Sequence, residues 1–72
     1  MKYAIVHKKS AESAGIDVRY SMHSADKTKV ILNENELRIK GDPEAVAKKL
    51  GGTLVNRSQL NNLMNSEIWQ NK

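Results

Sequence analysis

Residues that could take part in chemistry are few and scattered in this 72-residue chain. Two histidines, His7 and His23, fall near the ends of short β-forming stretches and are the first candidates for metal or acid–base chemistry. No third ligand stands at a recognisable spacing from them, and cysteine is absent, whereas metal sites normally take three or four protein ligands. We therefore expect ordinary surface or strand-end histidines, with no metal and no cofactor.

Paired carboxylates are the second candidate. Glu34 and Glu36 stand two positions apart, and on a strand they would share a face, as glycosidase-like chemistry needs. A chain this short leaves no room for a walled cleft, so a solvated turn is the simpler interpretation. The Gly51–Gly52 pair ends a predicted helix and lacks the following lysine and hydroxyl residue of a phosphate loop. We expect no enzymatic activity.

The clearest structural signal is a helix over 42–50. Asp42 can accept hydrogen bonds from the first turn, and Pro43 suits the first helical position. Lys48 and Lys49 place positive charge at the negative end of the helix dipole. One of the two glycines that follow can close the helix in a left-handed conformation.

The segment AVAKKLGGTLVNRSQLNNL (45–63) resembles a helix-turn-helix DNA-binding unit. Ala47 and Gly51 match the small residue and turn glycine of that family, and Leu60 matches a buried position late in its second helix. Arg57 departs from the pattern, because the family places a buried aliphatic residue there. The resemblance implies six residues that contact nucleic acid: Asn56, Arg57, Gln59, Asn61, Lys48 and Lys49. Fragments elsewhere (MKYAIV, ESAGI, KVILNENEL) also resemble small uncharacterised bacterial proteins that have no assigned activity.

Three stretches have strand character. Residues 1–7 are apolar on both faces, which favours an interior strand. Residues 16–23 alternate between apolar and polar, and with 28–32 they predict an antiparallel hairpin. Residues 33–40 remain open, because Asn33 and Glu36 fit a helix cap whereas 37–40 alternate as in a strand; we expect a turn and a short strand from Glu36.

The end of the chain is also ambiguous. Residues 53–56 fit either a short strand or a second helix, and the β-branched Thr53 and Val55 favour the strand. Ser58 can cap a last helix. In a regular helix Glu67 would fall on the apolar stripe and Trp69 opposite it, so we expect a break near 65–66. The stripe consists of Leu60, Leu63 and Met64.

These elements predict a single α+β domain over 1–72. We expect an antiparallel sheet of three or four strands with two helices packed on one face. The predicted core is Tyr3, Ile5, Val18, Tyr20, Val30, Leu32, Val46, Leu50, Leu60 and Leu63.

The core is thin, with sixteen Ile, Val and Leu residues and no Phe. Self-association is a common remedy in so small a domain. We therefore expect a cytoplasmic, non-catalytic interaction module that acts through a homodimer or a sheet surface, with itself and an unknown protein as partners and no membrane. Its net charge of +4 is interspersed, so nucleic acid is the alternative partner. The expected contact residues are Met64, Ile68 and Trp69.

Overall fold

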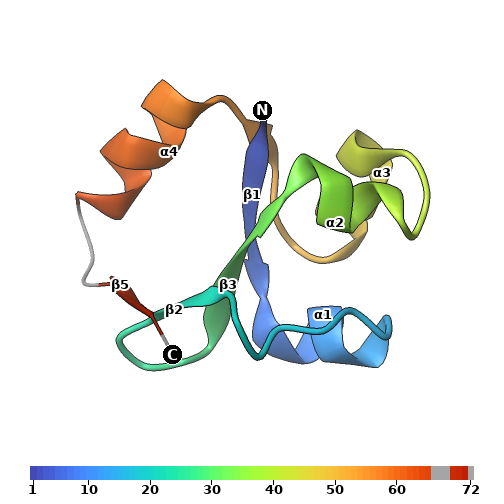
Figure 1. Cartoon of the computed structure of the whole chain (residues 1–72), viewed down its shortest axis with the longest axis horizontal. Helices are drawn as coiled ribbons and strands as arrows, with labels where there is room; N and C mark the ends of the chain where they lie inside the picture. Colours follow the sequence, from blue (N-terminus) through green and yellow to red (C-terminus); the bar gives the residue numbers. More distant parts are fainter. Residues whose placement is uncertain (66–68, 72) are drawn as a thin grey trace.

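The protein forms an α+β fold of short strands and short helices, confirming the predicted class (Figure 1). The computed structural model describes residues 1–65 and 69–71. Its elements are β1 (Tyr3–His7), α1 (Lys8–Ser13), β2 (Met22–Ser24), β3 (Lys29–Asn33), α2 (Glu34–Arg38), α3 (Pro43–Lys49), β4 (Leu54–Val55), α4 (Arg57–Met64) and β5 (Trp69–Asn71).

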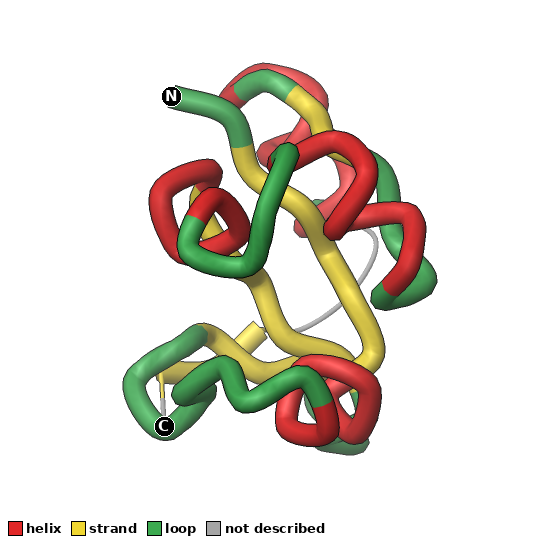
Figure 2. Tube along the Cα trace, turned by 90° about the vertical axis from the view of Figure 1, so that its right-hand side faces the viewer, coloured by secondary structure: helices red, strands yellow, loops and turns green. Residues whose placement is uncertain are grey.

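The strands form one antiparallel sheet in the order β4-β1-β3-β2-β5. Its centre is the pair β1 and β3, which run side by side from Tyr3 opposite Asn33 to His7 opposite Lys29 (Figure 2). The predicted hairpin of β2 and β3 is present. The predicted antiparallel sheet is therefore confirmed, and the short strand β5 extends it at the edge of β2.

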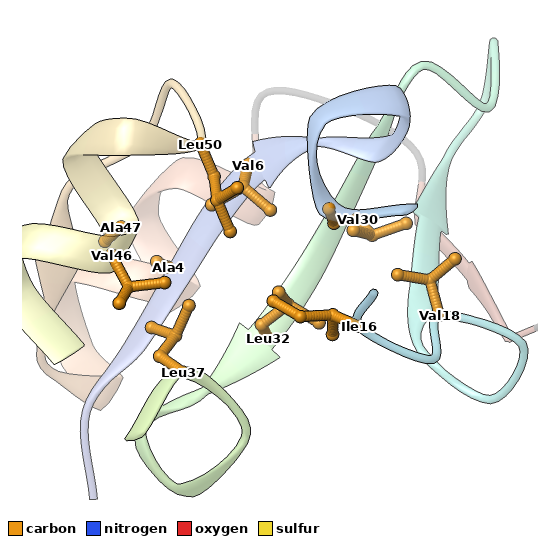
Figure 3. Close-up of a cluster of buried hydrophobic side chains, with 11 residues drawn as sticks. Ala4, Val6, Ile16, Val18, Val30, Leu32, Leu37, Val46, Ala47 and Leu50 are labelled. Atoms are coloured by element: carbon orange, nitrogen blue, oxygen red, sulfur yellow. The ribbon is translucent and has the colours of Figure 1, made fainter. Parts of the chain in front are cut away.

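One face of this sheet carries the hydrophobic core. Ala4, Val6, Val30 and Leu32 alternate along β1 and β3 and are almost completely buried, because side chains two positions apart share a face. Figure 3 shows this cluster between the sheet and the helices, with Val6 beside Leu50. Helices α1, α2 and α3 close the core with Ala11, Leu37, Val46, Ala47 and Leu50.

The opposite face is approached by a different helix. In Figure 1, α4 lies on one side of β1, and α2 and α3 lie on the other. The helices are thus divided between the two faces, whereas we expected two helices on one face. As a result Tyr3 and Ile5, which we predicted in the core, point away from it and are half-buried.

The predicted strand over 16–23 is mostly wrong, because only its last residues pair as β2. Ile16 and Val18 reach the core from a loop, as their burial shows. Between them Asp17 accepts hydrogen bonds from the backbone N–H of Arg19 at 3.0 Å and from its guanidinium at 2.9 Å. Such local side-chain bonds compete with a strand ladder. Tyr20, also predicted in the core, is 82% exposed.

The predicted strand from Glu36 is wrong, and α2 stands in its place. Asn33 Oδ1 accepts the N–H of Glu36 at 2.8 Å, and Glu36 Oε1 accepts the N–H of Asn33 at 3.1 Å. This reciprocal cap satisfies two backbone donors that a helix start leaves free. Leu37 is buried, whereas Ile39 is 79% exposed, so the apparent alternation of 37–40 does not correspond to a sheet face.

The predicted helix over 42–50 is confirmed as α3, with Asp42 accepting the N–H of Ala45 at 3.2 Å. The chain then runs beside β1 into strand β4, which confirms the strand predicted after Gly52. Gly51 has φ +88° and lies against the ring of His7. A Cβ on Gly52 would meet the carbonyl oxygen of Ile5. Both glycines are thus required by the close approach of this segment to β1.

Helix α4 begins two residues earlier than expected. Asn56 rather than Ser58 is its N-cap, and the helix ends at Met64, in keeping with the expected break after it. Leu60 is buried as predicted, but Leu63 is 48% exposed. Ser66 and Glu67, on which part of that expectation rested, lie outside the described residues.

Candidate functional site

The second face of the sheet is apolar and only partly covered. Tyr3 and Ile5 on β1 and Ile31 on β3 alternate with the core residues and are half-buried. Met22 on β2 is half-buried beside them. Leu60 of α4 is buried above this face. The sheet therefore has apolar side chains on both faces, and in the described part of the chain the two-turn helix α4 covers part of the second one.

A groove of about 650 Å³ lies between α4 and this face. Tyr3, Met22 and Ile31 line it from the sheet, and Leu60 and Met64 line it from the helix. Tyr20 and six polar residues complete its lining: Asp17, Ser21, Asn33, Glu36, Arg57 and Asn61. We refer to the space bounded by these twelve residues as the α4 groove.

Each of the two tyrosines in the groove carries an arginine over its ring. The guanidinium carbon of Arg57 lies 5.7 Å from the ring centroid of Tyr3, and that of Arg19 lies 5.6 Å from the ring of Tyr20. Arg57 Nη1 also donates to the Tyr3 hydroxyl at 3.4 Å. These contacts hold Arg57 on the solvent side of the sheet, so its charge is not buried between two helices as the sequence pattern implied.

Asp17, one of the two carboxylates in the groove lining, keeps its charge well below neutral pH. The hydrogen bonds from Arg19 lower the pKa of Asp17 from 3.8 to about 2, because they stabilise the carboxylate form. Glu36 is held in position by its bond to the N–H of Asn33. The groove therefore presents carboxylates from the loop and α2, and a guanidinium from α4.

The expected interaction residues occupy different places. Met64 lines the α4 groove and is half-buried. Trp69 lies on β5 opposite Ser24, is half-buried, and has an indole N–H that is enclosed without a hydrogen-bond acceptor among the described residues. Ile68 lies outside the described residues. Of the three residues expected at a protein interface, Met64 is therefore the one that lines the groove among the residues that the structure describes.

The residues named for nucleic-acid contact are not brought together. Strand β4 lies between α3 and α4 and pairs with β1, so a strand stands where a helix-turn-helix has only a turn. Lys48 and Lys49 end α3, whereas Asn61 and Arg57 line the groove under α4. Asn56 and Gln59 cap α4 reciprocally, with N–H to oxygen distances of 3.1 and 2.8 Å, so their amide oxygens are already occupied.

The two histidines lie on opposite faces of the sheet. His7 belongs to the face of Tyr3 and is exposed, whereas His23 stands opposite Val30, faces the core and is 2% exposed. His23 Nδ1 lies 2.8 Å from the carbonyl oxygen of Ser21, to which a protonated Nδ1 donates. They are thus a surface residue and a core residue, and they cannot share a ligand.

The two glutamates are also held by separate structural contacts. Glu34 pairs with Arg38 at 2.8 Å on α2, and Glu36 caps the same helix. Within residues 1–65 and 69–71 no cluster of three or more His, Cys, Asp or Glu side chains is placed to hold a metal ion.

Sequence reasoning missed Tyr20, Met22 and Ile31 as groove residues. A signal for Ile31 was present, because residues 3–6 of β1 and 30–32 of β3 are apolar at every position. Such runs indicate a sheet covered on both faces. They do not identify the segment that covers the second face, since this depends on the path of the chain after β4.

Compared with known proteins, the chain matches no family model, no curated protein and no solved structure. None of the helices in the described part of the chain combines the length and apolar character needed to cross a lipid bilayer.

Proposed function

We propose that this protein is a small non-catalytic interaction module whose α4 groove binds a second copy of the same chain. The observation that carries the proposal is the apolar second face of the sheet, which α4 covers only in part. Exposed apolar surface with a polar rim is typical of interaction sites in small soluble domains. The absence of cysteine supports a reducing compartment, and we assign the module to the cytoplasm.

Tyr20 is the exposed apolar element of this surface. Its side chain is 82% exposed although it lines the groove. Covering a large side chain of this kind contributes about 2 kcal/mol, and tyrosine is enriched where interfaces are buried. The ring is also held by the cation–π contact with Arg19, so little side-chain freedom is lost when a partner covers it.

The charges at the groove favour a second copy over an unrelated partner. Glu36 of α2 and Arg57 of α4 both line the groove, as does Asp17, which is already paired with Arg19 at 2.9 Å. In a two-fold symmetric dimer, a contact from one residue of the first chain to another residue of the second chain is repeated in the reverse direction. A rim with both signs of charge is therefore able to complement itself, with Arg57 of each chain facing Glu36 of the other.

The test is sedimentation velocity at concentrations of about 10 and about 100 µM, a range that detects micromolar association. We expect two 8.1 kDa chains to sediment together. The variant Tyr20→Glu places a charge in the centre of the proposed contact without removing a buried side chain, and it should sediment as a monomer.

Ile39→Glu is the matched control, because Ile39 is an equally exposed apolar residue, at 79%, that does not line the groove. This variant should dimerise as the wild type does. A wild-type monomer at about 100 µM, or equal loss of dimer in both variants, would overturn the proposal.

A further inference from the structure

Three segments that are distant in the sequence meet at the end of β1. The backbone N–H of His7 donates to the carbonyl of Leu50 at 3.1 Å, and the N–H of Lys8 donates to the carbonyl of Thr28 at 2.8 Å. These bonds join the start of α1 to the β2–β3 turn and to the end of α3. The ring of His7 lies against Gly51 and closes this junction.

The junction gathers lysines that are dispersed in the sequence. Lys8 and Lys9 follow His7, Lys27 precedes Thr28, and Lys48 and Lys49 precede Leu50. A shallow depression of about 590 Å³ is lined by Lys8, Lys9 and Lys27 together with His7 and Thr28. We refer to Lys8, Lys9, Lys27, Lys48 and Lys49 as the lysine cluster.

The charges of the lysine cluster are available to a partner. Lys8 is half-buried and the other four lysines are exposed. Within the described ranges, the ion pairs involve Arg19 and Arg38 and none of these five lysines. Glu12 is the single acidic residue among the described residues that line the depression. Like charges held together in this way attract polyanions.

We infer that the lysine cluster binds the phosphate backbone of nucleic acid. Ammonium groups on flexible stems contact phosphates as point charges and do not read bases, so the expected binding is independent of sequence. Among the described residues, those that line the depression include no apolar side chain that could enter a membrane, whereas surface-bound membrane proteins usually combine basic and apolar residues. No residue of the cluster lines the α4 groove, so this inference stands apart from the proposed dimer.

The experiment measures fluorescence anisotropy of a labelled mixed-sequence DNA duplex over a salt series. The test variant Lys8→Gln/Lys48→Gln removes one charge from each side of the junction. Each lost phosphate contact should lower affinity about eightfold at ~0.1 M salt and reduce the slope of log K against log salt by about 0.9. We expect a loss of at least about tenfold for the double variant.

The control is Lys2→Gln/Lys40→Gln, which changes the net charge equally at two exposed lysines outside the cluster. Affinity within about twofold of the wild type is expected for this control. Equal losses in both double variants, with unchanged far-UV circular dichroism, would show a response to net charge alone and overturn the inference. Absence of wild-type binding at ~50 mM salt, or binding only to phosphatidylserine vesicles, would overturn it as well.

Discussion

At the scale of single residues, Gly52 occupies a position with no room for a side chain. A side chain there would meet the carbonyl of Ile5 and the side chain of Val6, so β4 could not keep its place beside β1. We predict that Gly52→Ala lowers the free energy of unfolding by about 2 kcal/mol, as overpacking against a backbone atom does. Urea unfolding followed by circular dichroism measures this difference.

Ser13→Ala is the control for that measurement, because Ser13 is exposed at the end of α1. Its effect should stay within about 0.5 kcal/mol. If Gly52→Ala unfolds at the wild-type urea concentration, the close approach of residues 50–52 to β1 is not a constraint on stability.

Asp26, in the β2–β3 turn, makes the stability of the fold depend on pH. Its carboxylate accepts the hydroxyls of Ser24 and Thr28, each at 2.7 Å, and these bonds lower its pKa from 3.8 to about 2. Since the unfolded chain takes up this proton first, the stabilisation is present above about pH 4 and is lost as the pH falls toward 2. Asp26→Asn, which keeps the acceptor oxygen, should lose less stability than the wild type between pH 5 and 2.5.

Chemical denaturation at both pH values gives this comparison. Asp17 also has a pKa of about 2, and it remains in both proteins, so its contribution cancels. Equal losses of stability in the wild type and in Asp26→Asn would show that protonation of Asp26 does not destabilise the turn.

At the scale of elements, α2 depends on its first turn. The helix has five residues, too few to be stable by propensity alone, and the reciprocal bonds of Asn33 and Glu36 hold its start. We predict that Asn33→Ala lowers the free energy of unfolding by about 1 kcal/mol. Asn35→Ala, an exposed change within the same helix, should be neutral or slightly stabilising. Equal effects of the two substitutions in thermal unfolding would show that the cap contributes nothing.

The elements also show what local sequence can predict. α3 was predictable because Asp42, Pro43 and the glycine pair act within a few residues. The cap of α2 is equally local, but the alternation of Leu37 and Ile39 suggested a strand instead of this helix. The strand prediction was wrong over residues 16–21 for a different reason. Their alternation reflects burial of Ile16 and Val18 from a loop, and a period of two does not reveal whether a neighbouring strand is present.

At the scale of the whole molecule, the candidate surfaces depend on long-range arrangement. The α4 groove takes residues from β1, the 17–21 loop, β2, β3, α2 and α4, and the lysine cluster takes them from three other parts of the chain. A sequence pattern indicates that β1 and β3 are apolar on both sides, but not that α4 crosses to the second face. That crossing follows from β4, whose pairing with β1 directs the chain to the edge of the sheet.

The place of β1 in the sheet also has a consequence for the order of folding. One edge of this strand pairs with β3. Its other edge pairs with Leu54 and Val55, which come later in the chain. During synthesis the β1–β3 pair can form while the second edge still shows free N–H and C=O groups. Open edges of this kind pair with other chains, so the pairing of Leu54 and Val55 with β1 covers backbone groups through which the protein could otherwise aggregate.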